Sequence, residues 1–386
     1  MLDDIIYLDH AAATPIDRRV FASMEPYFGE LFYNPSSPYK QAVAVRRDYE
    51  SARATIAQAI GAKPGEIIMT AGATESINLA FSAASGHAVT SAIEHDSVLA
   101  AAKRHDHTII AVGESGIAAA ADVQAAVTDK TTIISVALAN NELGTIQPIS
   151  ALAEIVAEVR RTRLHQGNKT PLYLHTDASQ GVGQLDIQVA RLGVDMMSLN
   201  AGKVYGPKQV GLLWIKPSVV VEPQIVGGGQ EGGLRSGTEN VAGVVGFATA
   251  LRQASEKRKS ETARLQKLRD YLQKQLVEAF PDAVLSGNSK RRLSGHLHIS
   301  FPGVDAERLV FMLENDNVMV ATGSACAANK DTRSHVLEAI GLDPAVIDGS
   351  LRLTLGRLST EANTKLAADK IKQAVSLEMK RSRGQA

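Results

Sequence analysis

The chain has 386 residues, 45% of them hydrophobic, and its 41 Lys and Arg balance 41 Asp and Glu. This length allows a large and a small domain, and the balanced charge offers no basic surface for direct nucleic-acid binding. No apolar run is long enough to span a membrane, and the first residues lack the pattern of a signal peptide. With Cys326 as the only cysteine, no intrachain disulfide can form, which suits a reducing cytoplasm. We therefore expect a cytoplasmic protein.

Strand and helix patterns alternate over the first 215 residues. Strands are expected at 66–70, 88–93, 108–112, 131–138, 172–176, 194–199 and 210–215, and helices at 39–60, 75–84, 98–104, 122–127, 150–164 and 187–192. This alternation predicts an α/β fold with a mainly parallel sheet and helices on both faces. Ligands of such sheets bind outside the carboxyl ends of the strands.

The remainder of the chain predicts a smaller unit. A glycine-rich loop at 227–238 precedes a long helix at 241–280, which we expect to bridge two domains. Strands at 296–301 and 351–355 and helices at 306–314, 335–340 and 361–378 follow. We assign residues 15–257 to a large α/β domain, and residues 1–14 and 258–386 to a small α+β domain.

Five polar residues follow predicted strands and should meet at one edge of the sheet: Thr74, His95, Asn141, Asp177 and Lys203. Each has an ordinary explanation as well, because Thr and Asp cap helices, Asn favours turns, and most lysines are solvated. Their convergence is the stronger observation.

The chemistry of these residues indicates a cofactor. The turn at 71–76 offers free helix N–H groups to a phosphate, and Thr74 could add a hydroxyl, but the turn lacks the lysine of a P-loop. Asp177 can hold the protonated ring nitrogen of pyridoxal phosphate, and His95 can stack on a flat ring or carry protons. A lysine between buried strands, such as Lys203, can form Schiff bases.

Two pairs of histidines could act as metal ligands. His105 and His107, and likewise His296 and His298, are alternate residues that share a strand face. No third ligand stands at a recognisable spacing, so we expect no metal site.

Motifs from residue 8 to 357 together carry a resemblance to a known family. They are LD at 8–9, AATP at 12–15, NPSS at 34–37, GATES at 72–76, EH at 94–95, NNELGT at 140–145, DASQ at 177–180, KVYGPK at 203–208, GGGQE at 227–231, RSGT at 235–238, GSAC at 323–326 and SLRLTLGR at 350–357. In this set the chain resembles the cysteine desulfurases, pyridoxal 5'-phosphate enzymes of the class V aminotransferase group. The resemblance implies the type I fold of pyridoxal-phosphate transferases.

The resemblance also implies a role for each matching residue. Lys203, Cys326 and His95 are the catalytic residues, with Lys203 bound to the cofactor and Cys326 taking the substrate sulfur as a persulfide. The cofactor-binding residues are Thr74, Ala73, His95, Asn141, Asp177, Gln180, Asn200, Lys203 and, from a second subunit, Thr238. The substrate-binding residues are Asn34, Asn141 and Arg352, with Arg352 on the carboxylate.

Four positions depart from the family pattern, of which Thr322 in place of the usual serine is the mildest. Gly202 replaces the histidine that usually precedes the lysine, and Asn200 replaces serine or threonine, so cofactor binding is expected to differ. His10 stands where asparagine or tyrosine is more usual, near the expected substrate entrance.

The expected function is therefore a homodimeric cysteine desulfurase. It converts L-cysteine to L-alanine and passes sulfur to an acceptor protein, such as an iron–sulfur scaffold or a tRNA-thiolation protein. Two alternatives stay open: another class V enzyme, such as a selenocysteine lyase or a small-amino-acid aminotransferase, and a non-catalytic binding protein in which Gly202 marks decay.

Overall fold

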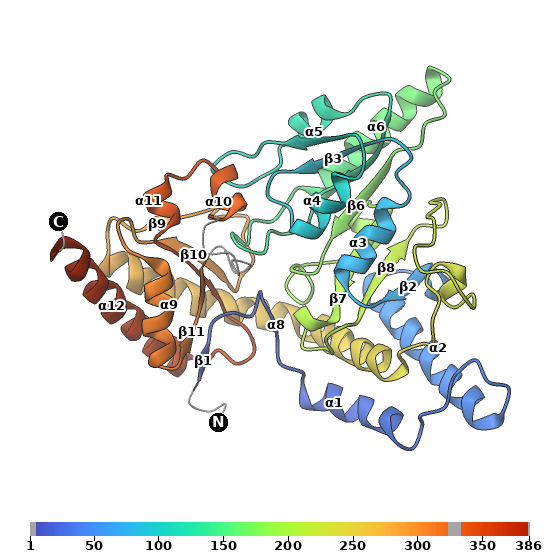
Figure 1. Ribbon diagram of the computed structural model, residues 1–386, viewed down its shortest axis with the longest axis horizontal. Coiled ribbons are helices and arrows are strands. Elements are labelled where there is room, and N and C mark those ends of the chain that lie inside the picture. Colours follow the sequence, from blue (N-terminus) through green and yellow to red (C-terminus); the bar gives the residue numbers. More distant parts are fainter. Residues whose placement is uncertain (1–4, 323–332, 385–386) are drawn as a thin grey trace.

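A seven-stranded sheet forms the larger part of the molecule. The computed structural model describes residues 5–322 and 333–384 (Figure 1). The strands in spatial order are β2 (Ile67–Thr70), β8 (Gly211–Ile215), β7 (Met196–Asn200), β6 (Tyr173–Asp177), β5 (Thr131–Ser135), β3 (His87–Ser91) and β4 (His107–Ile110). Only β8 runs antiparallel to its neighbours in this sheet. The prediction of a mainly parallel α/β sheet is confirmed.

Helices cover both faces of this sheet. Alternate strand residues point to opposite faces, so Ile67 and Met69 of β2 pack into one core and Ile68 into another. The helices α3 (Ala73–Phe81) and α4 (Asp96–Ala102) cover the Ile68 face. The other face packs against α1 (Arg18–Met24), α2 (Lys40–Ile60), α5 (Ala120–Ala126), α6 (Ile149–His165), α7 (Val189–Leu192) and the start of α8 (Val241–Ala279).

The smaller unit is a four-stranded antiparallel sheet with its own core. Its order is β12 (Ala321–Thr322), β13 (Ser350–Thr354), β10 (His296–Ser300) and β9 (Val284–Leu285). Buried residues of α9 (Ala306–Asn315), α12 (Glu361–Gly384) and the second half of α8 complete this core. The pair β1 (Ile6–Tyr7) and β11 (Val318–Met319) adds Ile6 and Val318 to this core. Helices α10 (His335–Ala339) and α11 (Pro344–Ile347) instead pack against the large core through Val336, Leu337 and Ile347.

Helix α8 connects the two cores. Residues from Val241 to Ala254 are buried in the large core, whereas Leu265, Leu268, Leu272 and Leu276 are buried in the small one. The expected domain boundary at 257 and 258 falls within this helix, and the division into two domains stays a prediction.

The elements that sequence patterns did not predict are short. They are α1, α11, the two-residue strands β1, β9, β11 and β12, and the 3-10 turns η1 (Glu25–Phe28), η2 (Pro64–Glu66), η3 (Ala201–Lys203) and η4 (Glu231–Gly233). Elements of this length contain too few residues for a hydrophobic period to be visible.

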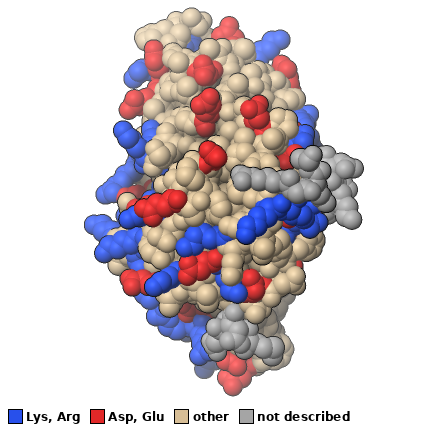
Figure 2. Space-filling view, turned by 90° about the vertical axis from the view of Figure 1, so that its left-hand side faces the viewer, with Lys and Arg blue, Asp and Glu red and all other residues tan. Residues whose placement is uncertain are grey.

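The surface carries both signs of charge. On the face shown in Figure 2, Lys and Arg gather along the left-hand edge, and Asp and Glu lie among uncharged residues elsewhere. Within the described ranges, no helix has both the length and the apolar character needed to cross a bilayer.

The close approach of β8 to the start of α3 gives a test of the fold. A Cβ atom on Gly211 would lie 2.6 Å from the Cα of Gly72 and 2.8 Å from the carbonyl oxygen of Leu199. Because these are backbone atoms, Gly211→Ala must displace β8 or the helix start, and we expect it to lower the free energy of unfolding by about 1–3 kcal/mol. Denaturant unfolding measures this loss.

Gly65→Ala is the matched control, since a Cβ there meets no atom within 4 Å. Equal stability of the two variants would contradict the proposed close contact.

Candidate active site

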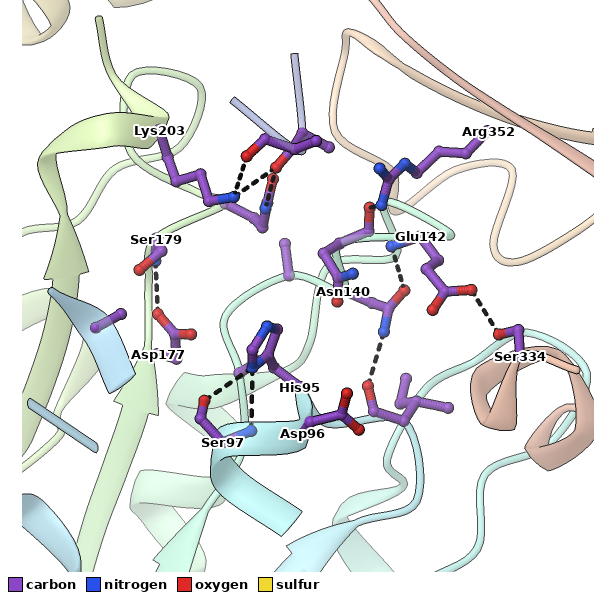
Figure 3. A pocket seen from close by; sticks show the side chains of 18 of the residues that line it. His95, Asp96, Ser97, Asn140, Glu142, Asp177, Ser179, Lys203, Ser334 and Arg352 are labelled. Atoms are coloured by element: carbon purple, nitrogen blue, oxygen red, sulfur yellow. Dashed lines mark hydrogen bonds between the residues drawn. The ribbon is translucent and has the colours of Figure 1, made fainter. Parts of the chain in front are cut away.

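A cavity of about 790 Å³ lies at the carboxyl ends of the parallel strands. It collects nine residues that the sequence had singled out: Ala73, Thr74, His95, Asn141, Asp177, Gln180, Asn200, Lys203 and Arg352. Figure 3 shows several of these side chains directed toward the same space from different elements. The expectation that strand-end residues meet at one edge is therefore confirmed.

Lys203 is held by a segment from the far N-terminus. It ends the 3-10 turn η3, directly after β7. Its Nζ donates to the carbonyl oxygens of Ala11 at 2.9 Å and Ala12 at 2.7 Å. Gln180 Nε2 donates to the same Ala11 oxygen at 3.1 Å. The amine therefore reaches the cavity wall rather than bulk solvent, as a Schiff-base lysine requires.

Asp177 and His95 stand at the ends of β6 and β3. Asp177 Oδ1 accepts the N–H of Ser179 at 2.9 Å, which fixes the carboxylate at the cavity. His95 caps α4, and its Nδ1 accepts the Ser97 N–H at 3.1 Å. That bond places the proton of a neutral imidazole on Nε2. The site thus combines a fixed carboxylate with an oriented proton donor.

The start of α3 has the features expected of an anion site and lies beside the lysine. Its N-cap residue is Gly72, with φ of +148° and no side-chain cap, so the first N–H groups have no capping side chain. An adjoining cavity of about 600 Å³ is lined by residues 71–75, Asn200, Gly202, Lys203 and Lys208, among others. Helix N–H groups with a nearby ammonium suit a phosphate.

Asn200 and Gly202, the two unusual residues beside Lys203, are hydrogen-bonded to each other. Asn200 Oδ1 accepts the Gly202 N–H at 2.9 Å, and the amide nitrogen of Asn200 lies toward Gly72 at the start of α3. The Asn200 side chain can therefore donate to an anion there. A Cβ on Gly202 would meet Asn200 Oδ1 at 3.2 Å, so a larger residue fits after a small shift.

Arg352 lies in the centre of the small sheet and is 3% exposed. Its Nη2 donates to Asp9 Oδ1 at 2.8 Å, and its Nη1 lies 3.5 Å from the Asn141 carbonyl oxygen. Its Nε has no hydrogen-bond acceptor among the described residues. The guanidinium is thus oriented by Asp9 and retains donors for a further carboxylate.

Sequence reasoning gave no role to two buried glutamates near the site: Glu142 lines the cavity, whereas Glu94 precedes His95 and is not part of the lining. Burial raises the pKa of Glu94 to about 8, against hydrogen bonds from Ser91 and the Ala137 N–H. Burial also raises the pKa of Glu142 to about 7, against a hydrogen bond from Ser334. Their positions in the EH and NNELGT motifs were the available signal, but burial cannot be read from a motif.

Two predicted site residues, Asn34 and Thr238, do not line this cavity. Asn34 is exposed, and its Oδ1 accepts the Ser36 N–H at 2.8 Å. Thr238 is exposed at the end of the glycine-rich loop, where the resemblance assigns it to the site of a second subunit. Cys326 lies outside the described residues.

His10 differs from its expected place at a substrate entrance. It is 7% exposed, and its Nδ1 lies 3.0 Å from the Thr354 carbonyl oxygen. Burial lowers the pKa of His10 to about 4, so the ring is neutral. It lines a separate cavity of about 280 Å³ that shares Lys203 with the main one. Among the described residues, no group of three or more His, Cys, Asp or Glu could hold a metal ion.

The chain belongs to the class-V aminotransferase family, whose model, described as Aminotransferase class-V, matches residues 6–366. This match confirms the resemblance drawn from the motifs. Among curated relatives, cysteine desulfurase IscS of Dictyoglomus turgidum is 38% identical over 96% of this chain and 94% of its own. Cysteine desulfurase IscS 1 of Archaeoglobus fulgidus is 37% identical over 92% and 93%.

Solved structures agree with the family. A protein titled NifS-like has a TM-score of 0.88 and 31% identity, covering 97% of this chain and 100% of that one. A structure titled SspA in complex with cysteine has a TM-score of 0.78 and 34% identity, covering 91% and 98%. The fold is that of the NifS-like pyridoxal-phosphate proteins, as predicted.

The unusual Gly202 gives a test of the anion site. We expect Gly202→His to fold, and its imidazole to add a donor near the start of α3. One hydrogen bond to a charged group amounts to about 1.5 kcal/mol, so pyridoxal phosphate should bind roughly tenfold more tightly. Spectroscopic titration of the apoprotein measures the dissociation constant.

Gly202→Ala is the control, because it adds the Cβ without a donor. An unchanged dissociation constant in Gly202→His would contradict a phosphate position beside residue 202.

Proposed function

We propose that this chain converts L-cysteine to L-alanine and transfers the sulfur to Cys326 as a persulfide. The observation that carries the proposal is that Lys203, Asp177 and Arg352 line one cavity at the carboxyl ends of the sheet. A reactive amine, a fixed carboxylate and a buried guanidinium are what an amino-acid substrate and a pyridine cofactor require together. The family and its named desulfurase relatives support the same reaction.

The described residues fit pyridoxal 5'-phosphate. The uncapped start of α3 with Thr74 suits its phosphate, Asp177 its ring nitrogen, and Lys203 its aldehyde. When bound, the cofactor supplies an electron sink that stabilises negative charge at the substrate Cα. His95 and Gln180 line the same cavity, His95 to cover the ring and Gln180 to donate to its phenolic oxygen.

The chain's own groups then position the substrate and move its protons. Arg352 binds the α-carboxylate, with the Asn141 side chain as a second polar contact. The Lys203 amine takes the proton from Cα and delivers a proton to the product. His95, whose Nδ1 accepts the Ser97 N–H, has its Nε2 left to exchange a further proton.

Sulfur transfer requires the thiolate of Cys326 as nucleophile. It attacks the substrate sulfur, so a sulfur–sulfur bond forms as the bond from that sulfur to the substrate β-carbon breaks. The β-carbon keeps the electron pair and gains a proton, which yields L-alanine. The enzyme thiol and cysteine are thereby converted to enzyme persulfide and alanine, with no external oxidant or reductant.

A homodimer would complete the site. Thr238 and Asn34, which do not reach the cavity of their own chain, are exposed and available to another subunit. Asn34 follows an aromatic surface on which Phe32 is 68% exposed and stacks on Tyr33 at 4.6 Å. Exposed aromatic surface of this kind favours protein association. We further propose that the enzyme works in a reducing cytoplasm and passes its sulfur to an acceptor protein. Both proposals agree with a single cysteine, Cys326, that carries the persulfide.

Two substitutions test the assigned roles. Lys203→Ala should abolish the visible absorbance of lysine-bound cofactor and reduce alanine formation at least a thousandfold. Cys326→Ala should keep that absorbance but lose release of sulfide in the presence of a reductant. Alanine, pyruvate and sulfide are measured together.

Unimpaired sulfide release by Cys326→Ala would exclude the persulfide role. Pyruvate in place of alanine would instead favour another class V reaction.

Arg352→Lys tests recognition of the carboxylate. The substitution keeps the positive charge near Asp9 but removes the planar fork, so the KM for L-cysteine should rise about tenfold or more, with a smaller change in kcat. Steady-state kinetics measures both. Arg308→Lys is a control on the surface helix α9, and the same KM in all three proteins would exclude Arg352 as the carboxylate site.

A further inference from the structure

Glu142 places a buried carboxyl group in the wall of the active-site cavity. It is 7% exposed, and Ser334 Oγ donates to its Oε2 at 2.6 Å. Its backbone is fixed by Asn140, whose Oδ1 accepts the Glu142 N–H at 2.9 Å and whose Nδ2 donates to the Ile93 carbonyl oxygen at 2.7 Å. Figure 3 shows Glu142 between Arg352 and Ser334. The carboxyl group is therefore held close to the proposed carboxylate site.

Charged groups from three other elements face Glu142. Arg352 of β13 and His335 of α10 favour its ionised form, whereas Asp96 of α4 disfavours it. Arg352 is already paired with Asp9 at 2.8 Å, so its positive charge is largely compensated. The Arg352–Asp9 pair is thus close to neutral, and an ionised Glu142 adds a second negative charge beside that of Asp9. A ligand carboxylate at Arg352 would add a third.

We propose that Glu142 takes up a proton when a carboxylate ligand binds Arg352. The inference rests on the proposed function, which assigns the α-carboxylate to Arg352. The Asp9 carboxylate on Arg352, the ligand carboxylate and an ionised Glu142 in the same cavity wall repel one another, and protonation of the buried Glu142 removes its part of that repulsion. Protonated Glu142 also gains an O–H donor, which an ionised carboxylate lacks.

The pKa of Glu142 in the free protein determines how ligand affinity changes with pH. Burial raises the pKa of Glu142 to about 7, and the bound carboxylate raises that pKa further. The ligand therefore binds most tightly below the pKa of the free protein. Affinity falls as the pH rises through neutrality, and it levels off above the pKa of the complex.

Calorimetry measures this uptake without turnover. The cofactor-loaded protein is titrated with 3-(methylthio)propionate, which carries a carboxylate but neither an amine nor a thiol. Titrations between pH 6 and 9 are repeated in buffers that differ in ionisation enthalpy. For a pKa increase of one unit, binding should take up about half a proton near pH 7.5, and the dissociation constant should rise about tenfold across the range.

Glu142→Gln should lose this uptake and give a dissociation constant that varies little with pH. The amide keeps an acceptor for Ser334, and thermal unfolding checks that the variant is folded. Glu94→Gln is the matched control, because it removes another buried carboxyl of raised pKa that Ser91 and the Ala137 N–H hold instead. It should retain the uptake.

Ser334→Ala gives an independent test that keeps the carboxyl group. Because the Ser334 hydrogen bond favours the ionised form, its removal should raise the pKa of Glu142 and move the maximum uptake to higher pH.

Two results would overturn the inference: wild-type binding without proton uptake, or uptake that persists unchanged in Glu142→Gln. Failure of the underlying assignment has a different signature. In that case the ligand does not bind, or it binds Arg352→Lys and the wild-type protein equally well at every pH.

Discussion

The hydrogen bonds of residues 8–14, here called the crossing segment, hold the two sheets together at the active site. Its start belongs to the small sheet, because the His10 N–H donates to the Thr354 carbonyl oxygen at 3.2 Å. Its end is bound to η3, directly after β7 of the large sheet, because Thr14 Oγ1 donates to the Gly202 carbonyl oxygen at 2.9 Å. Tyr7 closes the bend between them by donating to the carbonyl oxygens of Asp9 and Ala13, both at 2.9 Å.

This arrangement explains how one short segment serves two functional side chains. Asp9 orients Arg352, while the neighbouring carbonyl groups of Ala11 and Ala12 bind Lys203. Carbonyl oxygens stabilise an ammonium group, so the segment provides a defined place for the charged lysine whenever the amine is not bonded to a ligand. Substrate recognition and the reactive amine are thus set by the same backbone.

Sequence reasoning succeeded where the signal was local. The apolar runs around Lys203 predicted β7 and β8, and the strand ends placed Asp177 and His95 at one edge of the sheet. It could not give the crossing segment its role, since the contacts of Asp9 and Ala11 join residues more than 190 positions apart. Contacts between residues so far apart in the sequence produce no periodic pattern from which they could be predicted.

The burial of individual side chains was the second feature that the sequence could not predict. His10 was expected near the substrate entrance, but it is a buried residue of the crossing segment. The raised pKa of Glu142 likewise depends on the surrounding fold. Motifs also do not show how far a matching residue lies from the cavity of its own chain. Asn34 and Thr238 match family positions, yet both are exposed and away from the cavity of their own chain.

The central claim is transfer of sulfur from cysteine to the enzyme's own thiol, and a single turnover tests it most directly. The cofactor-loaded protein is mixed with L-cysteine without reductant, and alanine and intact protein mass are then quantified. The account predicts one alanine per subunit and a mass gain of one sulfur atom on the peptide that contains Cys326. Alanine formed without that gain, or a gain without alanine, would contradict it.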